Sequence, residues 1–165
     1  MNLQPILGNQ YITLQPITSN DFDALYLVAS DPLIWEQHPD KLRYQKDVFQ
    51  QYFDSAIESK GAFLIIDTAT KDIIGSSRYY KLDETNKQVA IGYTFIAKKY
   101  WGTNYNHQLK KIMIDYAFEF VNSVKFYVGE NNIRSQKAIQ KIGASYFGKQ
   151  DKSLVYIINK QDWAF

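Results

Sequence analysis

The order of apolar patterns constrains the fold of this chain more than any other feature. Three strand-like runs, at about residues 62–67, 73–80 and 88–97, are joined by short polar turns, which is typical of an antiparallel meander. A long amphipathic helix at 106–122 and a buried strand at 124–128 follow. Because a helix separates strand 88–97 from strand 124–128, we predict that these two strands lie parallel and are joined by a right-handed crossover.

The remaining segments complete one α+β domain over residues 1–165. Asp31-Pro32 should break a first helix before a loop that contains Trp35, and Gly61 and Gly143 should end two later helices. The other predicted elements are a strand at 11–16, a helix after the caps at 18–21, helices at 46–59 and 133–142, and strands at 145–149 and 153–159. We therefore expect a mixed, mostly antiparallel twisted sheet of about seven strands with a central parallel pair, and about four helices.

Composition excludes several kinds of site and partner. The chain has no cysteine and only two histidines, His38 and His107, so we expect no thiolate zinc site, no histidine-rich metal site and no cysteine nucleophile. The 19 basic and 17 acidic residues give a net charge of +2, which offers no electrostatic case for nucleic acid. The first residues lack the pattern of a signal peptide, and no run reaches the ~20 apolar residues of a membrane span. We expect a soluble, cytoplasmic protein without a nucleic-acid or membrane partner, and either a monomer or a homodimer.

The segment from Ile91 to Asn106 leads from a strand through a Gly- and Asn-containing loop into the long helix. Gly102 can adopt positive φ, and Lys98 and Lys99 add positive charge nearby. Backbone N–H groups of a first helical turn lack partners, so this segment could hold an anion. A plain connection between strand and helix would show the same residues.

A second polar segment follows the strand at 124–128. Asn132 and Ser135 stand at the start of the last predicted helix. Both residue types are favoured as helix caps, so each could act locally rather than at a ligand.

Together, the two segments resemble the GNAT superfamily of N-acetyltransferases, particularly its RimJ/RimL-like branch. The stretch Tyr100-Trp-Gly-Thr-Asn-Tyr-Asn-His-Gln-Leu-Lys is similar to the cofactor loop and following helix of that family. Asn132-x-x-Ser135-x-x-Ala138-Ile-x-Lys-x-Gly143 is similar to its second cofactor motif. The N-terminal Leu14-x-Pro-x-Thr-x-x-Asp21-Phe, with Ser30-Asp-Pro before Trp35, resembles the same branch.

The resemblance implies an enzyme that moves acetyl from acetyl-CoA to a primary amine by direct attack in a ternary complex, with the parallel strands splayed apart. It places the pantetheine arm of coenzyme A along the backbone of Phe95, Ile96 and Ala97, with Asn132 bonding it and Ser135 facing the sulfur as proton donor. The pyrophosphate would be held by the backbone amides of Gly102, Thr103, Asn104, Tyr105 and Asn106.

The chain departs from the family pattern at three places. Lys99, Gly102 and Asn104 stand where the loop commonly has Arg or Gln, then Gly, then Gly or Ala. Ile139 occupies the position of a Tyr general acid, which leaves Ser135 as the substitute. Gln88 and Ala90 stand where an acidic base is often found, so the base is open.

Acceptor-side residues must then supply the base and the amine pocket. Glu36 and His38 are the catalytic candidates, since the loop that holds them borders the acceptor pocket in this family and a histidine near pKa 6.5 suits proton transfer. The residues expected to bind substrate are Trp35, Glu36, His38, Arg78, Tyr93 and Glu130. Arg43 and Arg78 could bind an acidic acceptor or simply pack.

The acceptor could be a protein N-terminus or a small amine. A catalytically weak acyl-CoA-binding or regulatory module on the same fold is the alternative to an enzyme.

Overall fold

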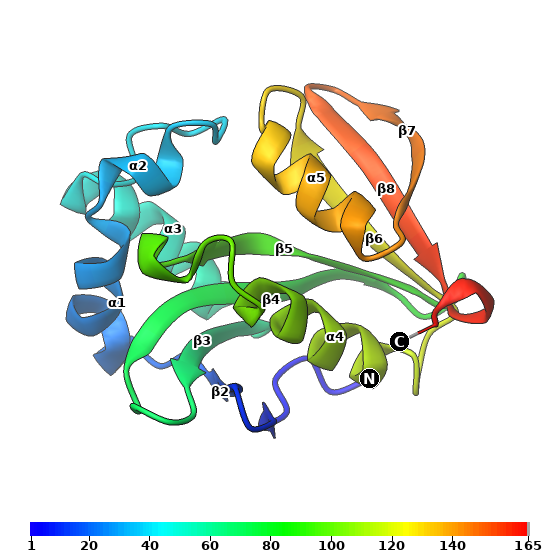
Figure 1. Ribbon diagram of the computed structural model, residues 1–165, viewed down its shortest axis with the longest axis horizontal. Helices are drawn as coiled ribbons and strands as arrows, with labels where there is room; N and C mark the ends of the chain where they lie inside the picture. The colour runs from blue at the N-terminus through cyan, green and yellow to red at the C-terminus, as the bar shows by residue number, and fades with distance from the viewer. Residues whose placement is uncertain (165) are drawn as a thin grey trace.

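A computed structural model describes residues 1–164, in which eight strands form a single sheet in the order β1-β2-β3-β4-β5-β6-β8-β7 (Figure 1). Neighbouring strands pair antiparallel except β5 and β6, which pair parallel. The strands are β1 (Leu7–Gly8), β2 (Ile12–Pro16), β3 (Ala62–Asp67), β4 (Ile73–Asp83), β5 (Gln88–Ile96), β6 (Ser123–Gly129), β7 (Ser145–Gln150) and β8 (Ser153–Asn159).

Helices cover both faces of the sheet. The α-helices are α1 (Phe22–Ala29), α2 (Pro32–Trp35), α3 (Lys46–Ser59), α4 (Tyr105–Ala117) and α5 (Ile133–Lys141). The first three gather at one end of the sheet, whereas α4 and α5 lie in front of it in the view of Figure 1. None of the helices in residues 1–164 is long and apolar enough to cross a membrane.

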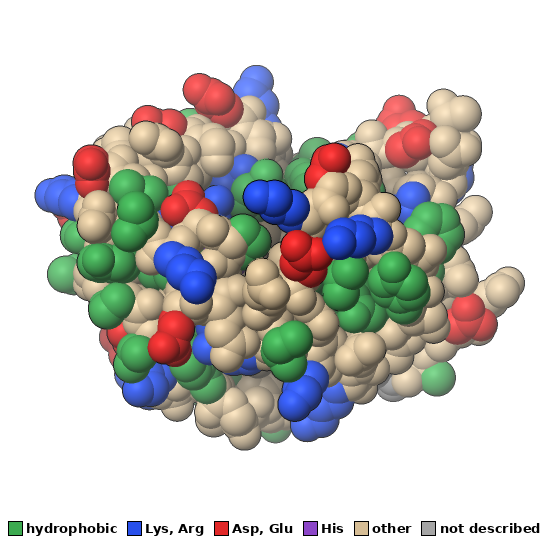
Figure 2. Space-filling view, turned by 90° about the horizontal axis from the view of Figure 1, so that it is seen from above, with side chains coloured by type: hydrophobic (Ala, Val, Ile, Leu, Met, Phe, Trp, Pro, Cys, Tyr) green, Lys and Arg blue, Asp and Glu red, His purple; other side chains and the backbone are tan. Residues whose placement is uncertain are grey.

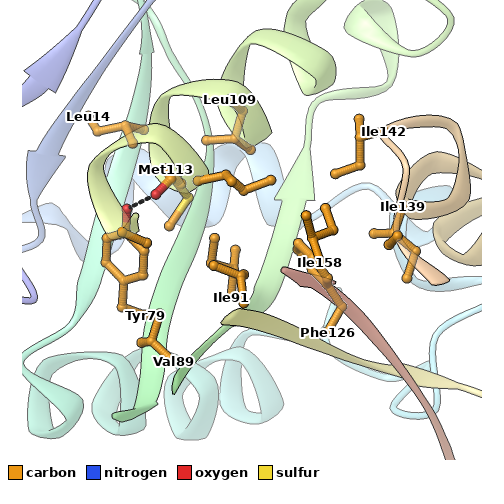
Figure 3. Close-up of a cluster of buried hydrophobic side chains, with 14 of the residues drawn as sticks. Leu14, Tyr79, Val89, Ile91, Leu109, Met113, Phe126, Ile139, Ile142 and Ile158 are labelled. Atoms are coloured by element: carbon orange, nitrogen blue, oxygen red, sulfur yellow. Dashed lines mark hydrogen bonds between the residues drawn. The ribbon is translucent and has the colours of Figure 1, made fainter. Parts of the chain in front are cut away.

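Each helical layer has its own hydrophobic core. On the α4–α5 face, Leu109 and Met113 of α4 and Ile139 of α5 pack with Ile91 of β5 and Phe126 of β6 (Figure 3). The Tyr79 hydroxyl donates to the Met113 carbonyl oxygen, which ties β4 to α4. On the opposite face, α1, α2 and α3 pack against β3 and β5 through a largely aromatic core. The apolar spacing on each helix therefore decides which side of the helix packs against the sheet.

The two central strands separate soon after they meet. Parallel pairing joins Gln88–Ala90 only to Ser123–Lys125, although β5 continues to Ile96 and β6 to Gly129. Beyond Ala90, β4 is the only strand of residues 1–164 that pairs with β5, so one edge of β5 faces the split between β5 and β6. A bulge in this free part places Tyr93 at φ +53°, an uncommon conformation for a residue other than glycine.

The predicted fold class is confirmed, including the antiparallel meander and the parallel crossover pair. Four details were wrong. The sequence reading missed the two-residue β1, and it missed α2, where Asp31 caps the helix by accepting from the Leu33 N–H and Pro32 occupies the first turn. It also extended α4 beyond Ala117. The predicted end of α3 at Ser59 is correct, but Lys60 rather than Gly61 takes the left-handed conformation that ends the helix.

Candidate functional site

The loop between β5 and α4 reaches the start of α4 through Gly102, Thr103 and Asn104. Gly102 has φ +72° and nothing lies within 4 Å of where its Cβ would be, so conformation rather than space requires glycine. Asn104 caps α4 without a side-chain hydrogen bond. The Asn104 side chain therefore does not occupy the first-turn amides of α4, although the Tyr105 N–H donates to the Thr103 hydroxyl at the long distance of 3.4 Å.

Trp101 ties this loop to the free edge of β5. Its indole N–H donates to the Ile96 carbonyl oxygen at 2.9 Å, while the Ala97 N–H donates to Ile74 on β4 at 2.7 Å. The carbonyl and the N–H of one trans peptide point in opposite directions, so the Ile96 carbonyl points away from β4, toward the split. Of the three residues expected along the pantetheine arm, Ile96 thus presents a carbonyl oxygen to the split, and Trp101 engages it.

The second predicted segment begins α5. Asn132 is buried and its Oδ1 accepts from the Ser135 N–H at 3.2 Å, so it does cap the helix. The cap uses only the amide oxygen, and the amide nitrogen is left for another partner. Ser135 is half-buried in the first turn of α5.

Arg134 bridges the two sides of the split. Its guanidinium carbon lies 3.8 Å from the centre of the Trp101 ring, and Nη2 donates to the Ile34 carbonyl oxygen at 3.1 Å. Its backbone N–H donates to the Gln37 side chain at 3.1 Å. The loop before α4, the start of α5 and the α2 segment therefore meet at one residue. Seen from above, Lys and Arg side chains flank a recess in this part of the surface (Figure 2).

The acceptor-side segment buries Trp35 and leaves His38 half-buried beside it. Trp35 is buried and its indole N–H donates to the Ala29 carbonyl oxygen at 2.8 Å. His38 lies edge-on to Trp35, with Nε2 3.3 Å from Nη1 of Arg43 and Nδ1 accepting from the Asp40 N–H. Burial, reinforced by Arg43, lowers the pKa of His38 to about 4. The ring is therefore neutral at pH 7 and has little affinity for a proton.

The two predicted glutamates lie apart. Glu36 is exposed, and its charge acts on Arg134. Glu130 forms an ion pair with Lys149 of β7 at 2.6 Å, which lowers the pKa of its carboxyl group. Glu130 thus already has a partner on the β7 side, whereas Glu36 faces solvent beside the split.

Arg78 and Tyr93 lie on the α3 face of the sheet, and the structure surrounds them with tyrosines that the sequence reading missed. The Arg78 guanidinium carbon is 4.0 Å from the centre of the Tyr93 ring and 5.5 Å from that of Tyr52. The Tyr80 ring lies 5.1 Å from Tyr93 and 6.2 Å from Tyr127. We call these four residues, Tyr52, Tyr80, Tyr93 and Tyr127, the tyrosine cluster.

Lys110 of α4 is a further buried cation, on the opposite face of the sheet. Its Nζ donates to Oγ1 of Thr94 on β5 at 2.9 Å, and Thr94 in turn bonds Ser77 of β4 at 2.8 Å. Burial alone lowers the pKa of Lys110 to about 7. The sequence carried a signal for it, because Lys110 precedes Met113 and Ile114 by three and four positions on the apolar stripe of the helix.

A hollow of about 660 Å³ lies outside the split, where the β4–β5 turn meets Lys125 and Tyr127 of β6. It extends the surface of the tyrosine cluster along the sheet rather than toward the start of α4.

Comparison with known proteins finds a matching family model and similar proteins. The family model described as acetyltransferase (GNAT) domain matches residues 12–145. A curated relative from Bacillus licheniformis, "Uncharacterized N-acetyltransferase p20", is 26% identical over 121 residues, which cover 70% of this chain and 67% of the relative.

Two solved structures share the fold. A GCN5-related N-acetyltransferase from Brucella melitensis has a TM-score of 0.85 at 16% identity, covering 97% of this chain and 80% of that one. Mycobacterium smegmatis RimJ in complex with CoA-disulfide has a TM-score of 0.73 at 14% identity, covering 96% of this chain and 88% of that one.

Proposed function

The chain belongs to the GNAT acetyltransferase family, and from this premise we propose that it transfers an acetyl group from acetyl-CoA to a primary amine, either a protein N-terminus or a small amine. The observation that carries the proposal is the split between β5 and β6, which opens beside the start of α4, where the Asn104 side chain forms no capping hydrogen bond. A strand edge without a partner and a helix N-terminus suit the extended arm and the phosphates of one ligand.

The residues present fit coenzyme A. The backbone amides of residues 102–106 would bind the pyrophosphate, for which the Thr103 and Tyr105 N–H groups would leave the Tyr100 carbonyl oxygen and the Thr103 hydroxyl. The free edge of β5 at residues 95–97 would bind the pantetheine arm, with the amide nitrogen of Asn132 opposite. Acetyl-CoA supplies an acetyl group activated as a thioester.

In the reaction, the lone pair of the amine forms a C–N bond to the acetyl carbon, the C–S bond breaks, and the nitrogen loses a proton. The protein chiefly has to hold the two reactants together, which can contribute several kcal/mol. We assign proton donation to the departing sulfur to the Ser135 hydroxyl. Of the two acceptor-side candidates, the exposed carboxylate of Glu36 is better suited to accept the amine proton than the half-buried ring of His38, whose pKa is lowered to about 4.

Purified protein with acetyl-CoA and a broad amine panel tests the proposal, with thiol release and acetylated product measured together. We expect Ser135→Ala to lower kcat at least about tenfold with little change in coenzyme A affinity. Equal, negligible effects of Ser135→Ala and Asn132→Asp would reject the assignment of this segment.

Asn132→Asp is the informative change at the other position. It keeps the oxygen that caps α5 and removes the amide donor, so coenzyme A binding should weaken while the melting temperature stays near wild type. Asn132→Ala removes both functions and serves as the comparison.

A catalytically weak acyl-CoA-binding or regulatory module is the second candidate. The low pKa of His38 and the ion pair of Glu130 favour it, because both weaken groups that could take a proton. Coenzyme A binding without turnover of any amine in the panel would establish this alternative.

A further inference from the structure

Arg78 of β4 is a buried cation without an anionic partner. It is only 3% exposed and forms no ion pair with any carboxylate in residues 1–164. Its guanidinium reaches the Ser55 hydroxyl, the Ser55 carbonyl and the Tyr52 carbonyl, all at the long distances of 3.3–3.4 Å. Nε is buried and has no hydrogen-bond partner.

Such a charge is unfavourable unless something compensates it. A buried charge is stable when it is paired with an opposite charge. An arginine cannot remove the cost of an unpaired charge by losing its proton, because its pKa is too high. The groups that Arg78 contacts on α3 are neutral carbonyls and a hydroxyl, so the positive charge itself is unmatched within the described chain.

A second guanidinium lies on the same tyrosine. The Arg43 guanidinium carbon is 5.1 Å from the centre of the Tyr52 ring, against 5.5 Å for Arg78. Arg43 has one carboxylate partner, Asp40 at 3.4 Å, whose side chain is 46% exposed. Together, Arg43 and Arg78 give this side of the split an excess of positive charge.

The tyrosine cluster adds hydrogen-bond donors around Arg78. Within residues 1–164, the hydroxyls of Tyr80, Tyr93 and Tyr127 form no hydrogen bond to another residue. Tyr93 stacks over Arg78, is 40% exposed, and has its backbone carbonyl held by the Tyr52 hydroxyl at 2.6 Å. Its ring can therefore turn toward solvent and uncover the guanidinium while the bulge stays in place.

We propose that the amine acceptor carries a carboxylate, and that Arg78, assisted by Arg43 and the tyrosine hydroxyls, binds it on the α3 face of the split. The acceptor class is an amino acid or a peptide with an acidic residue at its amino end, rather than a polyamine. Guanidinium groups bind carboxylates through paired hydrogen bonds, whereas a polyamine would meet two like charges. This inference rests on the proposed acetyl transfer, since it names the acceptor of that reaction.

Matched acceptors that differ only in the anionic group test it. Kinetic constants are measured for an amino acid against its amide, for Glu-Ala-Ala-amide against Gln-Ala-Ala-amide, and for spermidine. In one of the two pairs, we expect the acceptor with the carboxylate to have at least a tenfold higher kcat/KM than its uncharged counterpart. A difference in the first pair would identify a free amino acid as the acceptor class, and a difference in the second pair would identify an acidic peptide. Equal kcat/KM within both pairs, or a preference for spermidine, would overturn the proposal.

Variants assign the effect to Arg78. Arg78→Met should abolish the preference within the responding pair by lowering kcat/KM for its carboxylate member at least tenfold. Lys46→Met is the matched control, because Lys46 also lies over aromatic rings of the α1–α3 layer but away from the split. It should keep the wild-type preference, and a loss there equal to that of Arg78→Met would contradict a role specific to Arg78.

Binding without acetyl-CoA separates this inference from the proposed function. Titration of the same acid and amide pairs into the wild-type protein, followed by calorimetry or by tyrosine NMR signals, should show at least tenfold tighter binding of the acid. Selective acid binding without turnover would reject the acetyl transfer and retain the anion site. Turnover without selective binding of the acid would support the acetyl transfer and reject the anion site.

Discussion

Lys110 and Arg78 are buried on opposite faces of the same part of the sheet, and they respond differently to a lack of counterions. Lys110 lies under α4 and Arg78 under α3, and neither forms an ion pair within residues 1–164. Burial lowers the pKa of Lys110 to about 7, so the amine can become neutral. A guanidinium cannot do so at physiological pH. Without a nearby anion, Lys110 can therefore lose its proton and become neutral, whereas Arg78 stays charged and requires an anionic partner.

The largest expected effect is that of Lys110→Met on stability. Removing a buried ammonium that is disfavoured in the folded state should raise the free energy of unfolding at pH 7 by about 2–4 kcal/mol, less about 1 kcal/mol for the bond to Thr94. Chemical denaturation measures the difference. Lys111→Met, at the next position of the same helix, where the lysine is paired with Asp115, is the control. A Lys110→Met protein less stable than wild type would show that the folded protein compensates the charge of Lys110.

The wild-type protein should become more stable as pH rises through this range. The unfolded chain holds the Lys110 proton up to about pH 10.5, whereas the folded chain releases it near pH 7. The unfolded state binds more protons between these values, so stability should rise by about 2 kcal/mol from pH 7 to pH 9. Lys110→Met should lack this rise, and parallel pH profiles for the two proteins would contradict the assignment.

Arg78→Lys replaces the guanidinium with an amine that can lose its proton, as Lys110 can. The variant should be about 1–2 kcal/mol less stable than wild type at pH 7, because it loses the bonds to Ser55 and Tyr52 and keeps a buried charge. Since the new ammonium can discharge, the deficit should shrink toward pH 9. Denaturation at both pH values checks this, and a deficit that is independent of pH would argue against an uncompensated charge. Arg43→Lys, beside Asp40, should show no such pH dependence.

Thr94→Val is expected to have the smallest effect. Valine keeps the branched shape and removes the hydroxyl that Lys110 and Ser77 share, which should cost about 1 kcal/mol. Thr94→Ser retains the hydroxyl, and the comparison of the two variants isolates it. Equal stability of the two would show that Lys110 does not depend on this bond.

Much of the fold was predictable because its signals are local. The bounds of α3, β3 and β8 match those predicted, since each is a periodic run with a clear boundary. The parallel β5–β6 pair followed from the length of the connection between them. The resemblance to GNAT proteins is confirmed by the family match.

The candidate site was less predictable because its properties depend on tertiary neighbours. Arg78 and Tyr93 were named from their residue types, but nothing local shows that one is stacked on the other or that no carboxylate approaches. The low pKa of His38 likewise depends on burial and on Arg43. Lys110 is the exception, since its place on an apolar stripe was readable in the sequence.

The short β5–β6 pairing also bears on aggregation. A continuous sheet exposes only its two outer strands, whereas this sheet also has two interior edges, along β5 beyond Ala90 and along β6 beyond Lys125. Unpaired strand edges invite the addition of foreign strands. The bulge at Tyr93 interrupts the regular extended backbone that such a strand would need. The irregularity beside the split thus protects the protein from pairing with other chains.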